Sequence, residues 1–513
     1  MLRDTGLPLG RWLNAQTAIL LSIFILFYFF RIASFTISID DEFGAVRESP
    51  NVWLLQGRWA VYLLERFVVT HQVLPFFPFI VFGACLAISY RIFLSTFGVD
   101  RLSKVDYLTF ALYAGYPIWM FSLSFFSNAI AFGLGQLFAI ASIYHLGSFL
   151  ASRERNTSFR QSVAPMLYAC VLGAVAIGMY QSYVFLIASL GFGLIVVRIL
   201  QENSGWRRAL IGSTWIAVGV LLSIAVYEMV QQALLAVTQL GSERYVANFL
   251  DWHSLRNNPL QVVYTVIVGG LQAYGGSAEV FGVTLLGFAA VVILGFASTA
   301  FWPGLSWRSR SAAIVLLAVL AALPFLLHLA AGGRLPARTL VAVPAVVWLL
   351  ARLSVGSSRR ILSVLGFCAI TVSAVQSLYA LNLLQTANVF ARAHDEALAS
   401  AIYEKIISID ADTRDGHAPV LDFSGAKEFV SIYPRPTPAT MGYSFFEWDG
   451  GNSYRIVAYL HLLGYPSFEV ANQQQRREDD VVFRDMPSWP APGSVRSFKG
   501  VVLIKLGPKP GFR

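Results

Sequence analysis

The sequence predicts a polytopic α-helical membrane protein with about eleven transmembrane helices and a small mixed α/β domain at its C-terminal end. Two observations predict this class. Hydrophobic residues make up 56% of the 513 residues and charged residues only 13%, whereas about 25% of an average soluble domain is charged. The apolar residues also gather in runs of roughly 20, the length that crosses the hydrocarbon core of a bilayer. The apolar excess is therefore expected to face lipid.

Apolar runs of this kind follow one another from residue 16 to residue 383. We expect the first to be retained as a signal-anchor, because it is too long for a cleaved signal peptide and acids follow it instead of a small-residue cleavage site. The third and fourth runs are separated only by the short gap Ser124–Asn128, and the tenth is brief and contains Pro344. The runs are 16–39, 73–95, 106–124, 128–150, 163–181, 183–200, 209–237, 280–300, 312–330, 339–353 and 361–383.

The distribution of charge predicts the orientation. The chain is basic, with a formal net charge of +9, but its cations lie in every second loop between apolar runs, as the positive-inside rule predicts. We therefore expect membrane lipid and no nucleic acid as a partner, with the N-terminus in the cytoplasm and the C-terminus outside. The cations on the expected cytoplasmic side are Arg3, Arg11, Arg101, Lys104, Arg153, Arg155, Arg160, Arg207, Arg208, Arg308, Arg310, Arg359 and Arg360.

The composition changes after the last run, which predicts a membrane module at 1–383 and an outer domain at 384–513. A helical pattern occupies Asn388–Ile407, and short β-like runs occupy Val420–Phe423, Glu428–Ile432 and Ser497–Ile504. The outer loops of the membrane module are expected at 40–72, 239–279 and 331–338. The three cysteines lie inside apolar runs, so neither a disulfide framework nor a cluster of metal-binding thiolates is expected.

Three consecutive acids, Asp40-Asp41-Glu42, directly follow the first run. Carboxylates this close together at the lipid boundary repel one another and lose solvation, which should raise at least one pKa. The alternative is an ordinary polar end to a helix.

A helix is expected over Asn51–Val69, because apolar residues recur there at helical spacing. It is too polar to span a membrane and should lie along the outer interface. Its Gln56-Gly57-Arg58-Trp59 stretch places a guanidinium beside a residue with no side chain, where a phosphate has room to approach. Alternatively, Arg58 is an interface residue whose charged end reaches water.

Two further outer loops carry candidate residues. Arg334 and Arg338 lie on the outer side, against the charge rule, and guanidinium groups suit phosphate oxygens; the alternative is that they cap helix ends. The loop 239–279 contains Trp252 and an apolar stretch, Leu260–Leu271, that is expected to form a second interfacial helix. Its aromatic residues suit stacking on a sugar, but they are equally typical of a membrane-interface belt.

Together these features resemble a known family. The Asp40-Asp41 pair, the Gly57-Arg58-Trp59 turn and the late Arg334–Arg338 segment are similar to the bacterial O-antigen-modifying glucosyltransferases, the serotype-conversion Gtr type within the GT-C class of membrane glycosyltransferases. In the outer domain, the stretch Ser444–Asp449, with Asn452 and Arg455, is similar to another stretch of this family. Where the family often has Gly-Arg-Pro, this chain has Gly57-Arg58-Trp59, which leaves the shape of that turn open.

The resemblance implies a GT-C-like fold in the bacterial inner membrane, with the outer domain in the periplasm. It implies a sugar donor, a hexose such as glucose on polyprenyl phosphate, and transfer with inversion to a hydroxyl of a lipid-linked or cell-surface glycan such as O-antigen. An acid of the first outer loop would act as base: Asp41 is our first choice, Asp40 the nearest alternative and Glu42 the third. The expected phosphate ligands are Arg58, Arg334 and Arg338, and the candidates for sugar or acceptor binding are Trp59, Trp252, Glu447, Trp448 and Asp449.

No cofactor is expected, although a divalent metal at the three acids remains an alternative. Two other functions also remain open, a transporter or flippase of lipid-linked glycans and a non-catalytic scaffold. The enzyme hypothesis depends on one spatial prediction: the early carboxylates and the late arginines must meet in a single pocket at the outer rim of the membrane.

Overall fold

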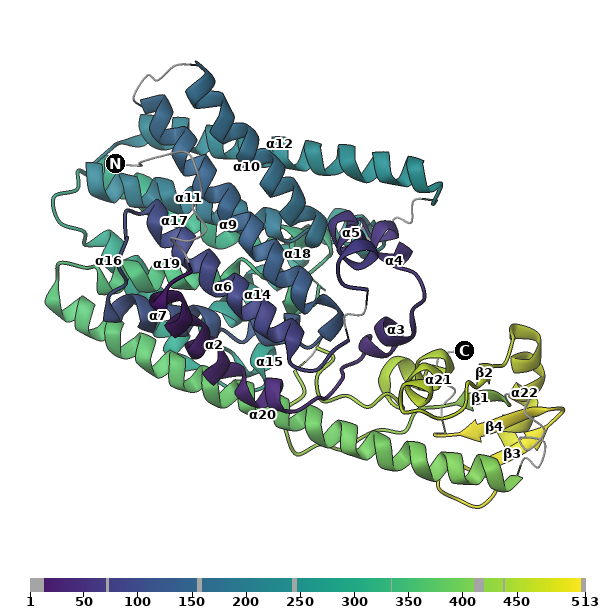
Figure 1. Ribbon diagram of the computed structural model, residues 1–513. Coiled ribbons are helices and arrows are strands. Elements are labelled where there is room, and N and C mark those ends of the chain that lie inside the picture. The colour runs from purple at the N-terminus through teal and green to yellow at the C-terminus, as the bar shows by residue number, and fades with distance from the viewer. Residues whose placement is uncertain are drawn as a thin grey trace.

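The computed structural model describes residues 13–70, 73–154, 159–241, 247–333, 335–409, 419–436 and 439–508. Most of these residues are helical. The helices pack side by side in one bundle, and the C-terminal region lies beyond one end of that bundle (Figure 1).

Seven helices within the described residues are long and apolar enough to cross a membrane. This agrees with a polytopic membrane protein, but the count of eleven spans is not confirmed. The seven are α2 (Ala15–Ala33), α6 (Phe77–Thr96), α9 (Phe126–Glu154), α11 (Tyr183–Glu202), α12 (Trp206–Thr238), α20 (Arg360–Ile409) and the segment Trp307–Ala330, which comprises α17 (Trp307–Ala322), the 3-10 turn η2 (Leu323–Phe325) and α18 (Leu326–Ala330).

The other expected spans are shorter helices. α10 (Phe159–Met179) contains an apolar segment from Val163, and α16 (Leu286–Ala300) and α19 (Val343–Val355) are apolar but short. The single helix expected at 106–124 is wrong: α7 (Lys104–Ala114) and α8 (Ile118–Ser122) take its place. The break falls just before Pro117, which disfavours a helical conformation of the residue that precedes it.

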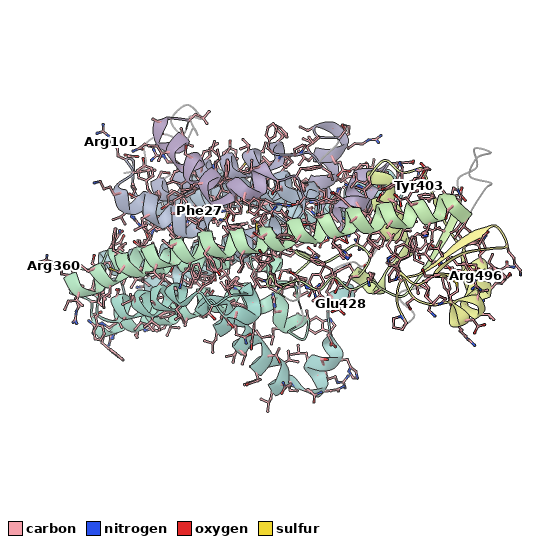
Figure 2. All side chains as sticks on the ribbon, turned by 90° about the horizontal axis from the view of Figure 1, so that it is seen from below. Phe27, Arg101, Arg360, Tyr403, Glu428 and Arg496 are labelled. Atoms are coloured by element: carbon pink, nitrogen blue, oxygen red, sulfur yellow. The ribbon has the colours of Figure 1, made fainter. Side chains whose placement is uncertain are left out.

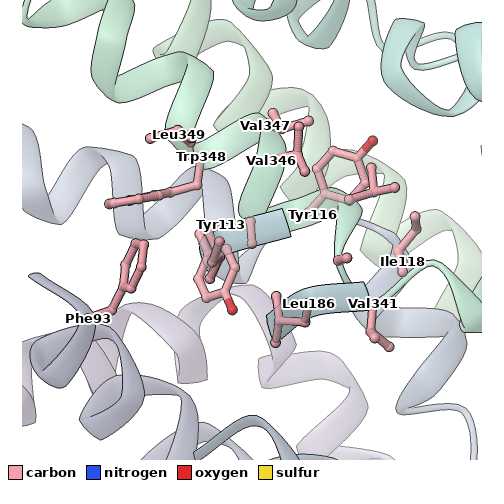
Figure 3. Close-up of a cluster of buried hydrophobic side chains, with 14 of the residues drawn as sticks. Phe93, Tyr113, Tyr116, Ile118, Leu186, Val341, Val346, Val347, Trp348 and Leu349 are labelled. Carbon is pink, nitrogen blue, oxygen red and sulfur yellow. The ribbon is translucent and has the colours of Figure 1, made fainter. Parts of the chain in front are cut away.

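The bundle has a continuous apolar core. Side chains from several helices meet in the part drawn in Figure 3, where Phe93 of α6, Leu186 of α11 and Trp348 of α19 are among the labelled residues. Tyr90 is a paired polar group in this core: its hydroxyl lies 2.9 Å from Thr109 Oγ1 and accepts a hydrogen bond from Trp348 Nε1 at 3.1 Å. Pairing of this kind is needed because a buried polar group without a partner costs free energy.

Two ends of the bundle can be distinguished. Figure 2 shows Arg101 and Arg360, both assigned to the cytoplasmic side by the charge rule, at one end of the molecule, and Arg496 of the C-terminal region at the other. We call these the basic end and the outer end.

A single 50-residue helix, α20, connects the bundle to the C-terminal region (Figures 1 and 2). The predicted domain boundary at residue 383 lies inside it, and the helical pattern expected at Asn388–Ile407 is its second half. Nothing in the sequence breaks the helix there. Polar side chains of α20 bind the segment after α2 and the C-terminal region. Gln385 Nε2 donates to Thr36 Oγ1 at 2.9 Å, and Asp395 accepts hydrogen bonds from Ser444 Oγ and, at 3.0 Å, from Phe445 N.

The C-terminal region contains a four-stranded mixed sheet with the order β2-β1-β4-β3. β1 is parallel to β2 and β4, and β3 is antiparallel to β4. The predicted strand at Val420–Phe423 is confirmed, whereas the run Ser497–Ile504 forms two strands joined by a turn at Lys499-Gly500. No strand forms at Glu428–Ile432, where Val430 and Ile432 are exposed. The elements are β1 (Val420–Ser424), η5 (Trp448–Gly450), α21 (Ser453–Leu462), β2 (Glu469–Val470), α22 (Gln473–Asp485), β3 (Val495–Phe498) and β4 (Val501–Lys505).

Short helices occupy the outer end of the bundle. The helix expected over Asn51–Val69 is interrupted at Gln56-Gly57-Arg58 and forms α4 and α5, while the expected interfacial helix at Leu260–Leu271 is present as α14 with mostly exposed apolar side chains. The elements are α3 (Asp41–Val46), α4 (Asn51–Leu55), α5 (Trp59–Phe67), η1 (Ala247–Phe249), α13 (Trp252–Asn257), α14 (Pro259–Gly275), α15 (Ala278–Phe281) and η3 (Ala337–Thr339).

The acidic loop after α2 is held by the core of the C-terminal region. Ile37 and Ile39 are buried in the same cluster as Phe445, Ile456 and Ile402. The alternation of Ile37 and Ile39 with polar neighbours is typical of an extended segment with one buried face. This packing fixes the segment that leads into the three acids.

Candidate active site

The three acids stand at the start of α3, and the local backbone gives them different surroundings. Asp40 has φ +85°, in the left-handed region, and precedes the first residue of α3. Asp41 and Glu42 form the first turn of that helix and are fully buried. Asp40 retains 47% of its side-chain surface. Only one of the three carboxylates is therefore accessible to a ligand from outside.

Asp41 is held in place by the backbone. Its Oδ2 accepts a hydrogen bond from Ser38 N at 3.0 Å, and its Oδ1 accepts one from Ser127 N, at the start of α9, at 3.2 Å. Burial raises the pKa of this carboxyl to about 6, although these hydrogen bonds and the nearby Arg31 oppose the shift. Arg31 is itself buried and donates to Ser124 O at 2.8 Å. Asp41 thus ties α3 to α9.

Arg455 of α21 contacts three carboxylates, those of Asp40, Glu42 and Asp449. Its Nη2 lies 3.1 Å from Asp40 Oδ1 and 3.0 Å from Asp449 Oδ2, and its Nη1 contacts Glu42 Oε1. Its guanidinium also lies over the ring of Phe43, 4.9 Å from the centroid. The C-terminal region therefore contributes the cation that balances the acids of the first outer loop.

A cavity of about 290 Å³ lies beside Asp40 at the outer end of the bundle. It brings together Asp40 and Arg58, from the first outer loop, and Arg338, from a segment far along the sequence. Asp41 and Glu42 do not line it. The complete lining is Asp40, Phe43, Arg47, Val52, Trp53, Gln56, Arg58, Phe125, Ser127, Asn128, Phe132, Tyr180 and Arg338. The spatial prediction from the sequence is therefore met for Asp40, Arg58 and Arg338.

The turn before Arg58 is shaped by contacts with the bundle. Gly57 has φ +76°, a conformation that favours glycine, and a Cβ there would lie 2.7 Å from Tyr227 Oη and 3.0 Å from Gln181 Nε2. Those two side chains bind the turn's carbonyl groups: Tyr227 Oη donates to Gly57 O at 2.8 Å, and Gln181 Nε2 to Gln56 O at 2.7 Å. The turn can thus present Arg58 without the proline that often follows this arginine in the family.

Aromatic rings hold both arginines in the cavity wall. The guanidinium of Arg58 lies 5.4 Å from the ring centroid of Trp53 and 5.0 Å from that of Tyr180. Arg338, in η3, lies 4.9 Å from the ring centroid of Phe125. Ring faces attract guanidinium groups, and these contacts keep both arginines at the wall of the cavity. Arg334, the third predicted phosphate ligand, lies outside the described residues.

The five residues predicted to contact the sugar or the acceptor do not lie together in the structure. Trp59 is 7% exposed and packs against Gly178, away from the cavity. Trp252 is 60% exposed at the start of α13 and does not line the cavity. Glu447 is paired with Arg435 at 2.9 Å, and the Trp448 ring makes an edge contact with Tyr443. Of these five residues only Asp449 reaches the acids, through Arg455.

Arg47, Asn128 and Tyr180 are among the cavity residues that the sequence interpretation missed. Arg47 donates to both carboxylate oxygens of Glu65, at 2.8 and 2.6 Å from Nη2, and so fixes α5 against the loop after α3. A signal for Arg47 was present, because it is one more cation on the outer side, where the charge rule disfavours it. Asn128 and Tyr180 gave no such signal, since either residue is ordinary at a helix end.

Within the part of the chain that the structure describes, no group of three or more His, Cys, Asp or Glu side chains is arranged to hold a metal ion. The cation beside Asp40 and Glu42 is the guanidinium of Arg455. The cavity thus has one accessible carboxylate, that of Asp40, and arginines in its wall. Chemically, such an arrangement can accept a proton and stabilise a phosphate in the same space.

Comparison with known proteins agrees with the resemblance seen in the sequence. Residues 29–354 match the family described as Glucosyl transferase GtrII. The match extends from the end of α2 to α19 and includes Asp40, Arg58 and Arg338, whereas α20 and the C-terminal region lie beyond it. No curated protein and no solved structure matches the chain. Because the match covers more than half of the sequence, the chain belongs to the GtrII family of glucosyl transferases.

Proposed function

We propose that this glucosyltransferase takes its sugar from a polyprenyl-phosphate donor at the outer face of the bacterial inner membrane and transfers it, with inversion, to a hydroxyl of a glycan such as O-antigen. One observation carries the proposal: Asp40, Arg58 and Arg338 line a single cavity at the outer end of a bundle of apolar helices. A donor with an isoprenoid tail, a phosphate and a sugar requires a site at the edge of the lipid that offers both cations and a base.

In this proposal Arg58 and Arg338 bind the donor phosphate. The bond between the anomeric carbon and the phosphate oxygen breaks during transfer, and its electron pair leaves with the phosphate. Arginines fixed where this negative charge develops stabilise the transition state. The stacking on Trp53, Tyr180 and Phe125 preorganises both groups, so little reorganisation is needed during the reaction.

We assign the role of base to Asp40 in place of Asp41, our first choice from the sequence. The acceptor hydroxyl attacks the anomeric carbon from the face opposite the phosphate, and its proton passes to the Asp40 carboxylate. Asp40 is accessible and lines the cavity, whereas Asp41 is buried with both oxygens engaged by backbone N–H groups. Asp41 and Glu42 then act as positioning residues: Asp41 anchors α3 to α9, and Glu42 anchors it to Arg455.

The size and lining of the cavity support a small polar ligand with an apolar extension. Its volume of about 290 Å³ is near the lower end of the range of about 300–1,000 Å³ for small-molecule sites. Phe132, Tyr180 and Trp53 provide ring surface beside the charged groups. Ring faces suit the C–H faces of a sugar as well as isoprenoid units, while Asn128 supplies an amide for hydroxyl groups.

The test uses the full-length chain purified in detergent, supplied with polyprenyl-phosphate glucose and a glycan acceptor. We expect release of polyprenyl phosphate and addition of glucose to the acceptor, both slowed about 10²–10⁴-fold by Asp40→Asn. Arg66→Gln is the matched control, because Arg66 is an exposed residue of α5 that does not line the cavity; this variant should retain full turnover.

Two outcomes would contradict the proposal. Full turnover by a folded Asp40→Asn variant would remove the assigned base. Movement of the lipid donor between leaflets without any glucose transfer would support the transporter hypothesis instead.

A further inference from the structure

A second cavity lies at the basic end of the bundle. It measures about 510 Å³ and is formed by the end of α9, the end of α11 and the beginning of α12. Three arginines, Arg153, Arg198 and Arg208, line it together with Trp215. The function proposed above does not use this cavity.

The position of this cavity follows from the course of α9. That helix begins beside the candidate active site, where Ser127 N binds Asp41, and ends at Glu154 in the wall of the second cavity. Its 29 residues correspond to a length of about 43 Å at 1.5 Å per residue. The two cavities therefore lie at opposite ends of the bundle, one on each side of the membrane.

The lining of the second cavity has more cations than anions. Arg198 pairs with Glu154 at 3.0 Å and Arg208 pairs with Glu202 at 3.3 Å, and both pairs are largely exposed. The guanidinium of Arg153 lies over the ring of Trp215 at 5.3 Å, and among the described residues no carboxylate pairs with it. Arg153 thus supplies an unbalanced charge on the cavity wall.

The remaining wall is apolar and continues onto the outside of the helices. Leu150, Ile195 and Ile199 contribute aliphatic surface inside. Ile211, also in the lining, is 50% exposed, and its neighbour Leu210 is 60% exposed. Within a run of spanning length, such exposed aliphatic side chains are expected to face acyl chains. A ligand in this cavity therefore meets arginines at one end and lipid-facing aliphatic side chains at the other.

We propose that this cavity binds the phosphate headgroup of an anionic phospholipid in the leaflet at the basic end, which the charge rule places in the cytoplasm. A phosphodiester supplies the negative charge that the three arginines attract, and its acyl chains fit the aliphatic surface beside them. Basic pockets between transmembrane helices on the cytoplasmic side suit such headgroups. A free phosphate ester satisfies the arginines alone and leaves the aliphatic wall without a partner.

The test is a binding measurement on the full-length chain in detergent. Native mass spectrometry follows the binding of phosphatidylglycerol and, separately, of the zwitterionic phosphatidylcholine. We expect phosphatidylglycerol to bind more tightly to the unmodified chain. The double variant Arg153→Gln/Arg208→Gln should lower its affinity about 25-fold, since each cation near an anionic lipid contributes about a fivefold factor.

Arg359→Gln is the matched control. Arg359 is exposed near the basic end and also lies over an aromatic ring, 4.7 Å from the Phe301 centroid, but it does not line the cavity. Its loss should leave the preference for phosphatidylglycerol unchanged.

Three outcomes would overturn the proposal. The first is equal affinity of the unmodified chain for the two lipids, which is decisive whether or not the variants fold. The second is an equal loss of binding in the Arg359→Gln control. The third is competition by glycerol 3-phosphate at concentrations similar to those of the lipid, which would identify a soluble phosphate ester as the ligand. Each of these results concerns lipid binding and leaves the proposed sugar transfer untouched.

Discussion

The two ends of the bundle carry similar side chains in different arrangements. At the outer end, Arg58 and Arg338 come from segments far apart in the sequence and lie in one cavity with an accessible carboxylate. At the basic end, the arginines come from helix ends, and Arg198 and Arg208 pair with acids in exposed positions. Both ends stack guanidinium groups on aromatic rings.

The difference shows how to separate topology from chemistry in a membrane protein. Arginines at the basic end are expected from the positive-inside rule alone, so their presence says little about activity. In the topology that we propose, arginines at the outer end oppose that rule and require another cause. Here the cause we propose is the phosphate of the donor, and the buried acids around Arg455 are the framework that holds the base beside it.

The most direct test of this comparison is to replace each of the two aspartates, Asp40 and Asp41, by asparagine in a separate variant. Asp40→Asn should lower kcat by about 10²–10⁴-fold, the usual contribution of a general base. Asp41→Asn should retain measurable turnover, because Asp41 serves to anchor α3. Steady-state release of polyprenyl phosphate measures both. The reverse ranking in folded variants would return the role of base to Asp41.

A second test removes the outer cations one at a time. Arg58→Gln and Arg338→Gln should each lower kcat by about 10²–10³-fold, the typical loss when one group that stabilises a developing charge is removed. Arg66→Gln, at an exposed position of α5, the helix that Arg58 directly precedes, should have no effect on kcat. If either cavity variant turned over as fast as this control, the phosphate would have to bind elsewhere.

A third test compares a buried ion pair with an exposed one. Arg455→Gln leaves the fully buried Glu42 without its cation. Burial raises the pKa of this carboxyl to about 8. Above that pH, where Glu42 is ionised, breaking the buried pair should destabilise by about 3–5 kcal/mol. Arg208→Gln breaks the exposed pair with Glu202 at the basic end and should cost at most about 1 kcal/mol. Thermal unfolding in detergent compares the two. The double variant Glu42→Gln/Arg455→Gln should recover part of the stability that Arg455→Gln loses. If Arg455→Gln and Arg208→Gln cost similar amounts of stability, Glu42 is not buried in the folded chain.

The pH dependence of stability tests the burial of Asp41. Burial raises the folded-state pKa of Asp41 to about 6 from its usual 3.8. The unfolded chain therefore loses this proton at lower pH than the folded chain, and stability falls as pH rises from about 4 to about 6. The loss amounts to on the order of 3 kcal/mol for this group.

Asp41→Asn cannot ionise and should remove that part of the slope when unfolding temperatures are measured between pH 4 and pH 7. An unchanged slope in this variant would mean that Asp41 titrates normally in the folded chain.

The smallest expected effect concerns two glycines that share one backbone conformation. Gly57 and Gly98 both have φ +76°, but only a Cβ at Gly57 meets other atoms, since nothing lies within 4 Å of the one built at Gly98. Gly98→Ala should cost about 1 kcal/mol of backbone strain. Gly57→Ala should cost more, up to about 3 kcal/mol, and should also lower kcat because Tyr227 or Gln181 must move and displace Arg58. Equal effects would show that the turn is not tied to the bundle.

Charge and hydropathy predict that the first acids, Arg58 and Arg338 share the outer side of the membrane, and the cavity does bring Asp40, Arg58 and Arg338 together. The choice between Asp40 and Asp41 could not be made, because it depends on the left-handed backbone of Asp40 and on hydrogen bonds from Ser127, a residue of another helix.

The contact of Arg455 with Asp40 and Glu42 joins opposite parts of the chain. No local sequence pattern predicts a contact between residues this far apart in the chain. Two predicted helices have other bounds in the structure. α20 continues past its apolar run because no helix-breaking residue stops it, whereas the apolar run at 106–124 is divided before Pro117.

The central claim is that the donor phosphate lies between Arg58 and Arg338 with the sugar facing Asp40. A structure of the full-length chain bound to a polyprenyl-phosphonate analogue of the donor, in which carbon replaces the bridging oxygen, tests it most directly. We predict phosphonate density within hydrogen-bonding distance of both guanidinium groups and the anomeric carbon on the Asp40 side of the cavity. Density for the analogue at the basic end of the bundle, with the outer cavity empty, would contradict the account.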